Sequence, residues 1–175
     1  MGRRNPRGRG PAVVVLAVAL GLAGCAGCDG RGRGQAAAEF SRGGFARDPD
    51  GLRAMVGRTL EVRGFVDHGN LYGDGGARAI LGDSWGGEGP APGTWRFDLK
   101  SRADDPVGHS FQVQVPNGPG RDALLRQLAA DARARRPTPV LVRGRLLTFD
   151  APTNVRRLTG ILLVPDSPRD IELHP

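Results

Sequence analysis

The chain has 175 residues, of which 39% are hydrophobic, a size and composition that suit one domain with a modest core. Its 28 glycines and 14 prolines indicate many turns and short strands and argue against a fold of long helices. The net charge is +7, but four arginines stand in the first ten residues and leave +3 on the remainder, too little for a dedicated nucleic-acid binder.

The first 24 residues have the layout of an export signal. Residues 1–10 are basic, and residues 11–24 form an uncharged apolar run. As a helix this run would span about 21 Å, short of the roughly 30 Å hydrocarbon core of a bilayer. It therefore indicates a signal peptide over 1–24 and not a permanent membrane span.

A cysteine follows the apolar run directly. Leu22, Ala23, Gly24 and Cys25 resemble the lipobox of bacterial lipoproteins, in which Leu and two small residues precede the modified cysteine. The resemblance implies cleavage before Cys25, acylation of Cys25 and stable anchoring by two or three acyl chains. Because residue 26 is Ala and not Asp, it also implies the outer membrane, facing the periplasm, if the organism has two membranes.

Other interpretations of this segment remain open. One is an ordinary cleaved signal with a chance cysteine, and another is a twin-arginine route beginning at Arg3 and Arg4. Cys25 and Cys28 spell C-x-x-C, a spacing also found in redox and metal sites. Lipidation of Cys25 would remove that pair and leave Cys28 as a lone thiol or a second acylation site.

The remaining chain divides into a tether and a domain. Residues 25–47 are rich in Gly, Arg and Ala without periodicity, so we expect a lipidated N-terminus and a flexible tether there. The domain is expected over 48–175. It begins with a short helix that Asp48 caps, that Pro49 opens and that ends at Gly57.

Alternating apolar residues predict the strands of the domain. These are 58–66, 77–81, 95–99, 111–115, 140–148, 158–164 and 171–173, with loops at 67–76 and 82–93. One helix is expected over 119–136, where Leu124 and Leu128 belong to an apolar stripe and Pro137 ends the element.

This order predicts a mainly β domain with one or two helices, arranged as a small five-stranded barrel with helix 119–136 between the third and fourth principal strands. It resembles OB-fold domains of the tRNA-anticodon-binding-like type that occur in some bacterial lipoproteins. The matching segments are 56–64, 140–146 and 157–163. The long 82–110 stretch departs from a minimal barrel and leaves the exact strand count open.

The sequence contains no convincing catalytic set, and we expect no cofactor and no metal. Residues 82–86 spell the G-x-S-x-G of hydrolases around Ser84, but a Gly-rich segment follows where a nucleophile elbow needs a helix. A small serine hydrolase using Ser84 is a minor alternative. The metal-ligand types at Asp98, Asp104, Asp105 and His109 are better explained by a solvated turn.

The candidate ligand-binding residues combine aromatic rings with positive charge. They are Arg63, Tyr72, Trp85, Trp95, Arg143 and Arg145. On the open face of a barrel the rings would stack on bases or sugars and the arginines would attract anions. The alternative for Trp95 is a place in the core, and Phe65 belongs either to an outer patch or under the helix.

We therefore expect an exported, membrane-anchored lipoprotein that acts as a non-catalytic binding module in the cell envelope. Its expected partners are the membrane, through the lipid anchor, and an envelope protein or glycan that the sequence does not identify. The alternative function is nucleic-acid or oligosaccharide binding by the OB-fold. The small net charge and the export signal count against nucleic acid.

Overall fold

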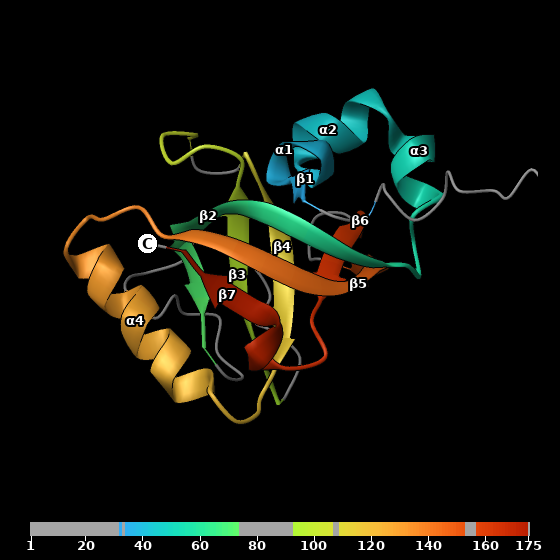
Figure 1. Ribbon diagram of the computed structural model, residues 1–175. Coiled ribbons are helices and arrows are strands. Elements are labelled where there is room, and N and C mark those ends of the chain that lie inside the picture. The colour runs from blue at the N-terminus through green and yellow to red at the C-terminus, as the bar shows by residue number, and fades with distance from the viewer. Residues whose placement is uncertain (1–31, 33, 74–92, 107–108, 153–156, 175) are drawn as a thin grey trace, which may run out of the picture.

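The computed structural model describes residues 32, 34–73, 93–106, 109–152 and 157–174. Seven strands and four α-helices lie within these ranges: β1 (Gln35–Ala36), α1 (Ala37–Phe40), α2 (Arg42–Arg47), α3 (Pro49–Arg53), β2 (Thr59–Tyr72), β3 (Thr94–Lys100), β4 (Ser110–Pro116), α4 (Arg121–Arg133), β5 (Pro139–Pro152), β6 (Arg157–Val164) and β7 (Ile171–Leu173). A 3₁₀ helix, Pro168–Asp170, precedes β7. In Figure 1, α1–α3 gather on one side of a curved sheet and α4 lies on the opposite side.

Five of the strands are paired in a ring. The sheet order is β1-β2-β3-β4-β6-β5-β7. An additional antiparallel pairing of β2 with β5 joins the two ends of the run β2-β3-β4-β6-β5 into a ring. The ring is partial, because β4 and β6 pair in parallel at only two positions. The prediction of a mainly β domain is thus confirmed, whereas the expected five-stranded barrel is only a partial ring, and β1 and β7 extend the sheet to seven strands.

Two glycines in the interior of long strands, Gly64 of β2 and Gly144 of β5, allow neighbouring segments to pass closely. A Cβ at Gly64 would lie 2.7 Å from the carbonyl oxygen of Lys100 and 2.9 Å from the Cβ of Ala37. A Cβ at Gly144 would lie 2.8 Å from the backbone of Val164. No side chain fits at either position, so the glycines permit the long strands β2 and β5 to contribute to both sides of the ring.

The core lies inside the ring and under the helices. The alternation predicted for the strands is confirmed: in β3 the residues Trp95, Phe97 and Leu99 are completely buried, and β4 repeats the pattern. The stripe of α4 contributes Leu124 and Leu128 to the same cluster. Burial of these apolar side chains is the main force that holds the helix to the sheet.

The N-terminal boundary of the domain differs from the prediction. β1 pairs in parallel with β2, and α1 places Ala37 and Phe40 in the core with 0% and 1% exposure. The Phe40 ring lies 5.7 Å from the Phe111 ring. The tether expected over 25–47 is therefore wrong for 35–47, because a short segment with only a few apolar residues shows no periodicity yet still fills a gap in the core. Residues 25–31 and 33 lie outside the described residues.

Other boundaries shift by smaller amounts. Asp48 caps α3 as predicted and accepts a hydrogen bond from the Gly51 amide. β2 continues to Tyr72 through an irregular register between Asp67 and Leu71, where a loop was expected. α4 is shorter than 119–136, since Gly120 precedes its first residue with a left-handed φ of 93°. The strand predicted at 77–81 lies outside the described residues.

Candidate ligand-binding surface

The structure brings three of the predicted arginines to one outward face. Arg63 lies on β2, and Arg143 and Arg145 lie on β5, at exposed positions that alternate with the buried residues of these strands. In the antiparallel register Arg143 lies opposite Glu61, and Arg63 follows two positions along β2. Residues paired in this way project from the same side of a sheet, so the three guanidinium groups share one surface.

A fourth cation extends the line. Phe65, the next outward residue of β2, pairs with Lys100 of β3 on one side and with Pro139 of β5 on the other. The four cations therefore cross three neighbouring strands diagonally, in the order Arg145, Arg143, Arg63, Lys100; we call these four residues the basic stripe. Alternate residues of a strand are about 7 Å apart, so one extended ligand can reach several of them.

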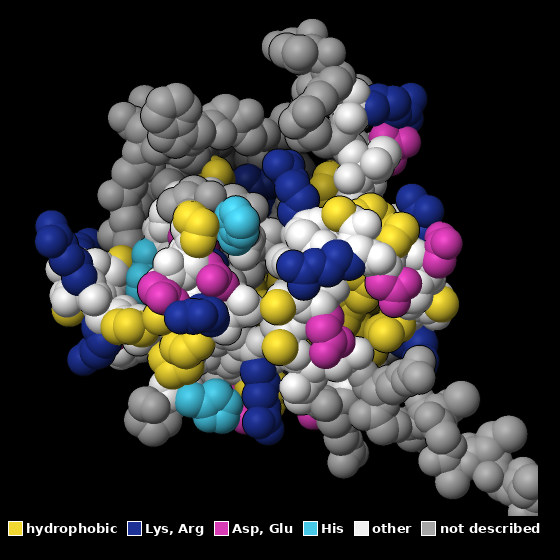
Figure 2. All heavy atoms as spheres, turned by 90° about the horizontal axis from the view of Figure 1, so that it is seen from above, with side chains coloured by type: hydrophobic (Ala, Val, Ile, Leu, Met, Phe, Trp, Pro, Cys, Tyr) yellow, Lys and Arg dark blue, Asp and Glu magenta, His cyan; other side chains and the backbone are white. Residues whose placement is uncertain are grey.

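The basic stripe has a local excess of positive charge. Within the described residues, the side chains of Arg63, Arg143 and Arg145 form no ion pair or hydrogen bond. Two carboxylates share the surface, Glu61 on β2 and Glu172 on β7. On the face drawn in Figure 2, basic and acidic side chains are interspersed, in keeping with the net charge of +3 outside the first ten residues.

A groove lies beside the stripe. It encloses about 430 Å³ and is lined by Arg63, Phe65, Pro139 and His174 among others. The Arg63 side chain lies close to the backbone of Gly34. A Cβ added at Gly34 would be 3.7 Å from the Nε atom of Arg63. The groove therefore combines a guanidinium group with a half-buried aromatic ring, which suits an anionic ligand that has an apolar or planar part.

The predicted aromatic residues are placed differently from the arginines. Trp95 is completely buried and stacks on Phe97 at 5.5 Å, so it fills the core and offers no face to a ligand. Tyr72 is 4% exposed, and the guanidinium group of Arg96 covers its ring at 4.0 Å. The alternation of apolar residues did not reveal whether the rings of Tyr72 and Trp95 point into the core or toward solvent.

Some predicted residues lie outside the described part of the chain. These are Cys25, Ser84 and Trp85. Among the residues that the structure does describe, no helix is long and apolar enough to cross a bilayer, and no three metal-ligating side chains come together.

A pair of carboxylates on neighbouring strands was not foreseen. Asp98 of β3 lies directly opposite Asp67 of β2. Asp67 is 2% exposed and accepts hydrogen bonds from the Gly69 amide and the Asn70 side chain. Burial, with the nearby Asp67 charge adding to it and Arg96 opposing it, raises the pKa of Asp98 to about 6. Carboxyl residues inside a strand pattern were the only signal available in the sequence.

A second unforeseen network joins α4 to β2. The buried Asp131 accepts hydrogen bonds from Arg136, from Gln127 and, at 2.9 Å, from the Thr138 hydroxyl. His68 Nε2 lies 3.0 Å from the same hydroxyl oxygen. Because the Thr138 hydroxyl donates its proton to Asp131, it can only accept from His68, so Nε2 of His68 carries the proton of the His68–Thr138 hydrogen bond. Burial lowers the pKa of His68, although Asp131 and Asp67 oppose this shift.

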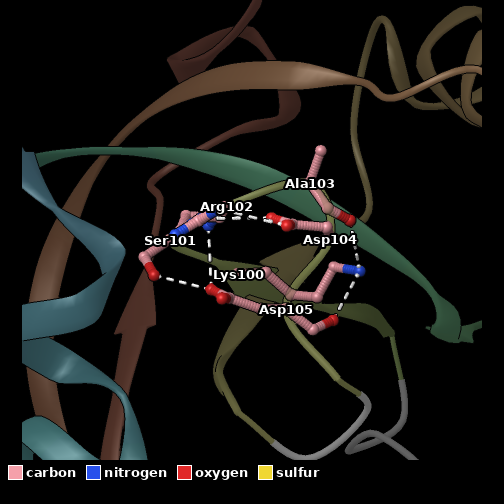
Figure 3. A network of polar contacts seen from close by, with 6 residues as sticks. All are labelled: Lys100, Ser101, Arg102, Ala103, Asp104 and Asp105. Atoms are coloured by element: carbon pink, nitrogen blue, oxygen red, sulfur yellow. Dashed lines mark hydrogen bonds and ion pairs between the residues drawn. The ribbon is translucent and has the colours of Figure 1, made fainter.

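The two aspartates of the turn after β3 have different hydrogen-bond partners (Figure 3). Asp105 accepts hydrogen bonds from the Ser101 hydroxyl and the Arg102 amide, while Asp104 pairs with the Arg102 guanidinium group. The hydrogen bond from Ser101 is the main cause that lowers the pKa of Asp105. The ammonium group of Lys100 donates to the carbonyl oxygens of Ala103 and Asp105, which fixes the last cation of the basic stripe.

No protein-family model and no curated protein sequence matches the chain. Among solved structures, the chain is similar to the mitochondrial single-stranded DNA-binding protein Rim1 from S. cerevisiae, with 15% sequence identity and a TM-score of 0.36. That similarity covers 68% of this chain and 96% of the other. The fold and the candidate surface are defined by the strand pairing and the exposed side chains described above.

Proposed function

We propose that this chain is an exported lipoprotein whose barrel is an OB-fold-like, non-catalytic module that binds an anionic polymer. The strand pairing supports the fold, because five strands form the ring and α4 lies between the third and fourth of them. The export signal and the resemblance to a lipobox at Cys25 support the address. The basic stripe supports the ligand class.

The observation that carries this proposal is the set of guanidinium groups with no ion pair among the described residues. OB-folds commonly bind polymers over their second and third strands, which are β3 and β4 here. The outward side chains of those two strands are half-buried, and Arg96 and Asp98 already interact with Tyr72 and Ser110. The three arginines of the basic stripe are exposed and lie in one line, so this is the better-supported surface.

The ligand class is tested by binding of the full chain to an acidic polysaccharide and to neutral dextran. We expect salt-sensitive binding to the acidic polymer only, and a loss of at least tenfold in affinity for Arg143→Gln combined with Arg145→Gln, since even one hydrogen bond to a charged group contributes about 1.5–3 kcal/mol. Arg47→Gln, an exposed arginine of α2, is the matched control. Equal binding to dextran, or an equal effect of the control, would refute the role of the stripe.

Single-stranded nucleic acid is the second candidate, and Phe65 is the observation that favours it. Its half-buried ring lies beside Lys100 and Arg63, and single-strand binders combine a basic track with aromatic rings for stacking. Binding to a homopolymeric single strand should then weaken steeply with salt and fall for Phe65→Leu. Tighter binding to the acidic polysaccharide than to the single strand would exclude this candidate.

The address is tested by labelling with radioactive palmitate. We expect incorporation into the wild-type chain and none into Cys25→Ser. Cys28→Ser is the matched control and should still be labelled at Cys25. Equal labelling of wild type and Cys25→Ser would refute the anchor, whatever the polymer experiments show.

A further inference from the structure

A second hollow lies on the other side of Phe65, between β2, the end of β3 and the end of α4. It encloses about 300 Å³, at the lower end of the range for small-molecule sites. Three segments that are far apart in the sequence line it: Phe65 to Gly69, Lys100 to Ala103, and the chain around Arg135 and Arg136.

The cations of this hollow are held in place. The ammonium group of Lys100 is fixed by two carbonyl oxygens, which leaves its third N–H unused by the described residues (Figure 3). Arg136 is anchored by the buried Asp131. A cation that is already positioned loses less conformational entropy when it binds an anion.

Arg135 adds a third cation at the point where α4 ends. Its φ of 52° is the one left-handed angle of a non-glycine residue in the described chain. Such a conformation costs about 1–2 kcal/mol for a residue with a Cβ. Within the described residues Arg135 forms no ion pair or hydrogen bond through its exposed side chain. Arg135 directly follows the C-cap Ala134, and the Arg136 amide donates to the carbonyl oxygen of Asp131, so the left-handed conformation ends α4 and places Arg135 and Arg136 in the lining of the hollow.

The remaining lining adds an apolar wall and little negative charge. Phe65, Ala132 and Pro137 form the wall. Asp67 is the one acidic residue that lines the hollow, and its carboxylate already accepts two hydrogen bonds. Three cations therefore line the hollow, of which Arg136 is balanced by its ion pair with Asp131, while Lys100 and Arg135 form no ion pair among the described residues. The carbonyl end of α4 opposes an anion here, so the proposal depends mainly on Lys100 and Arg135.

We propose that this hollow is a second site, adjoining the basic stripe at Lys100 and Phe65, for a small phosphate monoester with an apolar or ring-shaped body. Arg135, Arg136 and Lys100 hold the phosphate oxygens, for which guanidinium groups are well shaped. The body of the ligand packs against Phe65 and Ala132. His68, with its Nε2 proton committed to Thr138, forms the edge of the site.

The test measures binding of phenyl phosphate to the full chain by calorimetry, with phenol as the neutral probe of the same shape. We expect phenyl phosphate to bind, phenol to bind at least tenfold more weakly, and Arg135→Gln to weaken phenyl phosphate by about tenfold. Arg133→Gln is the matched control, since Arg133 is also exposed at the end of α4 but does not line the hollow.

A second readout follows the titration of the His68 ring by NMR. A bound phosphate beside the ring favours the imidazolium form, so phenyl phosphate should raise the pKa of His68 in the wild type and not in Arg135→Gln. Absence of phenyl phosphate binding, equal binding of phenol, or an equal loss in Arg133→Gln would each overturn the site. The polymer surface is tested separately through Arg143 and Arg145, so either proposal can fail alone.

Discussion

Asp98 on β3 and Asp67 on β2 occupy directly opposed positions in an antiparallel pair, with the Asp67 side chain almost completely buried. Like charges at such positions destabilise a sheet. The fold keeps this pair because Asn70 and the Gly69 amide satisfy Asp67, while Asp98 has a pKa raised to about 6 mainly by burial.

This pair predicts a stability that falls as the pH rises. The folded-state pKa of Asp98 lies above the ordinary value of 3.8, so its favourable contribution is complete below about pH 4 and is lost as the pH passes through about 6. Asp98→Asn cannot ionise, so its free energy of unfolding should exceed that of the wild type by about 1–3 kcal/mol at pH 8 and match it at pH 4, at about 1.4 kcal/mol per pKa unit.

Urea unfolding at the two pH values measures this effect. Asp166→Asn, a change at an exposed carboxylate after β6, is the control and should show no such difference between the two pH values. An Asp98→Asn protein that is less stable than the wild type at pH 8 would show that the Ser110 hydrogen bond outweighs burial of the charge.

Phe40 provides a test of the N-terminal segment. Because its ring is buried against Phe111, Phe40→Ala should lower the free energy of unfolding by about 3–5 kcal/mol. Phe45→Ala, at a partly buried ring of the same segment, should cost clearly less. Thermal and urea unfolding of both variants distinguish an integral segment from a tether, for which Phe40→Ala would have no effect.

Gly64 should not tolerate a side chain. Its added Cβ would meet the Lys100 carbonyl oxygen and Ala37, so Gly64→Ala is expected to cost about 2–3 kcal/mol by overpacking. In the exposed α2 helix, Gly43→Ala has only Ser41 Oγ nearby, at 3.9 Å, and should stabilise the chain by up to about 1 kcal/mol. A similar loss of unfolding free energy in the two variants would contradict the close contact of Gly64 with Lys100 and Ala37.

The Thr138 hydroxyl connects Asp131 to His68, so removing it should deprive each of these side chains of one hydrogen-bond partner. Thr138→Val keeps the shape but leaves the Asp131 carboxylate and the His68 Nε2–H without this partner, at a cost of about 1–3 kcal/mol. Thr148→Val, on the exposed side of β5, is the control and should be close to neutral. Calorimetric unfolding at neutral pH compares the two.

The sequence by itself determined most of the local structure. Alternation in segments such as 95–99 and 140–148 predicted the strands, because one buried face imposes a period of two. The Asp48 cap and the apolar stripe of α4 were also predicted, since each depends on residues only a few positions apart. From this order the outline of the ring followed. The three candidate arginines are exposed in the structure, while their role in binding a ligand stays a prediction.

Only the tertiary structure decided which of these residues meet. The diagonal of the basic stripe, the opposed Asp67 and Asp98, and the hollow between Lys100 and Arg135 depend on the register of β2 against β3 and β5 and on where α4 ends. A shift of one residue would turn every side chain to the other face, and no pattern within a single strand records which register is adopted. The same holds for Phe40, whose place in the core depends on a gap that the ring leaves open, and for Trp95, whose ring packs inward.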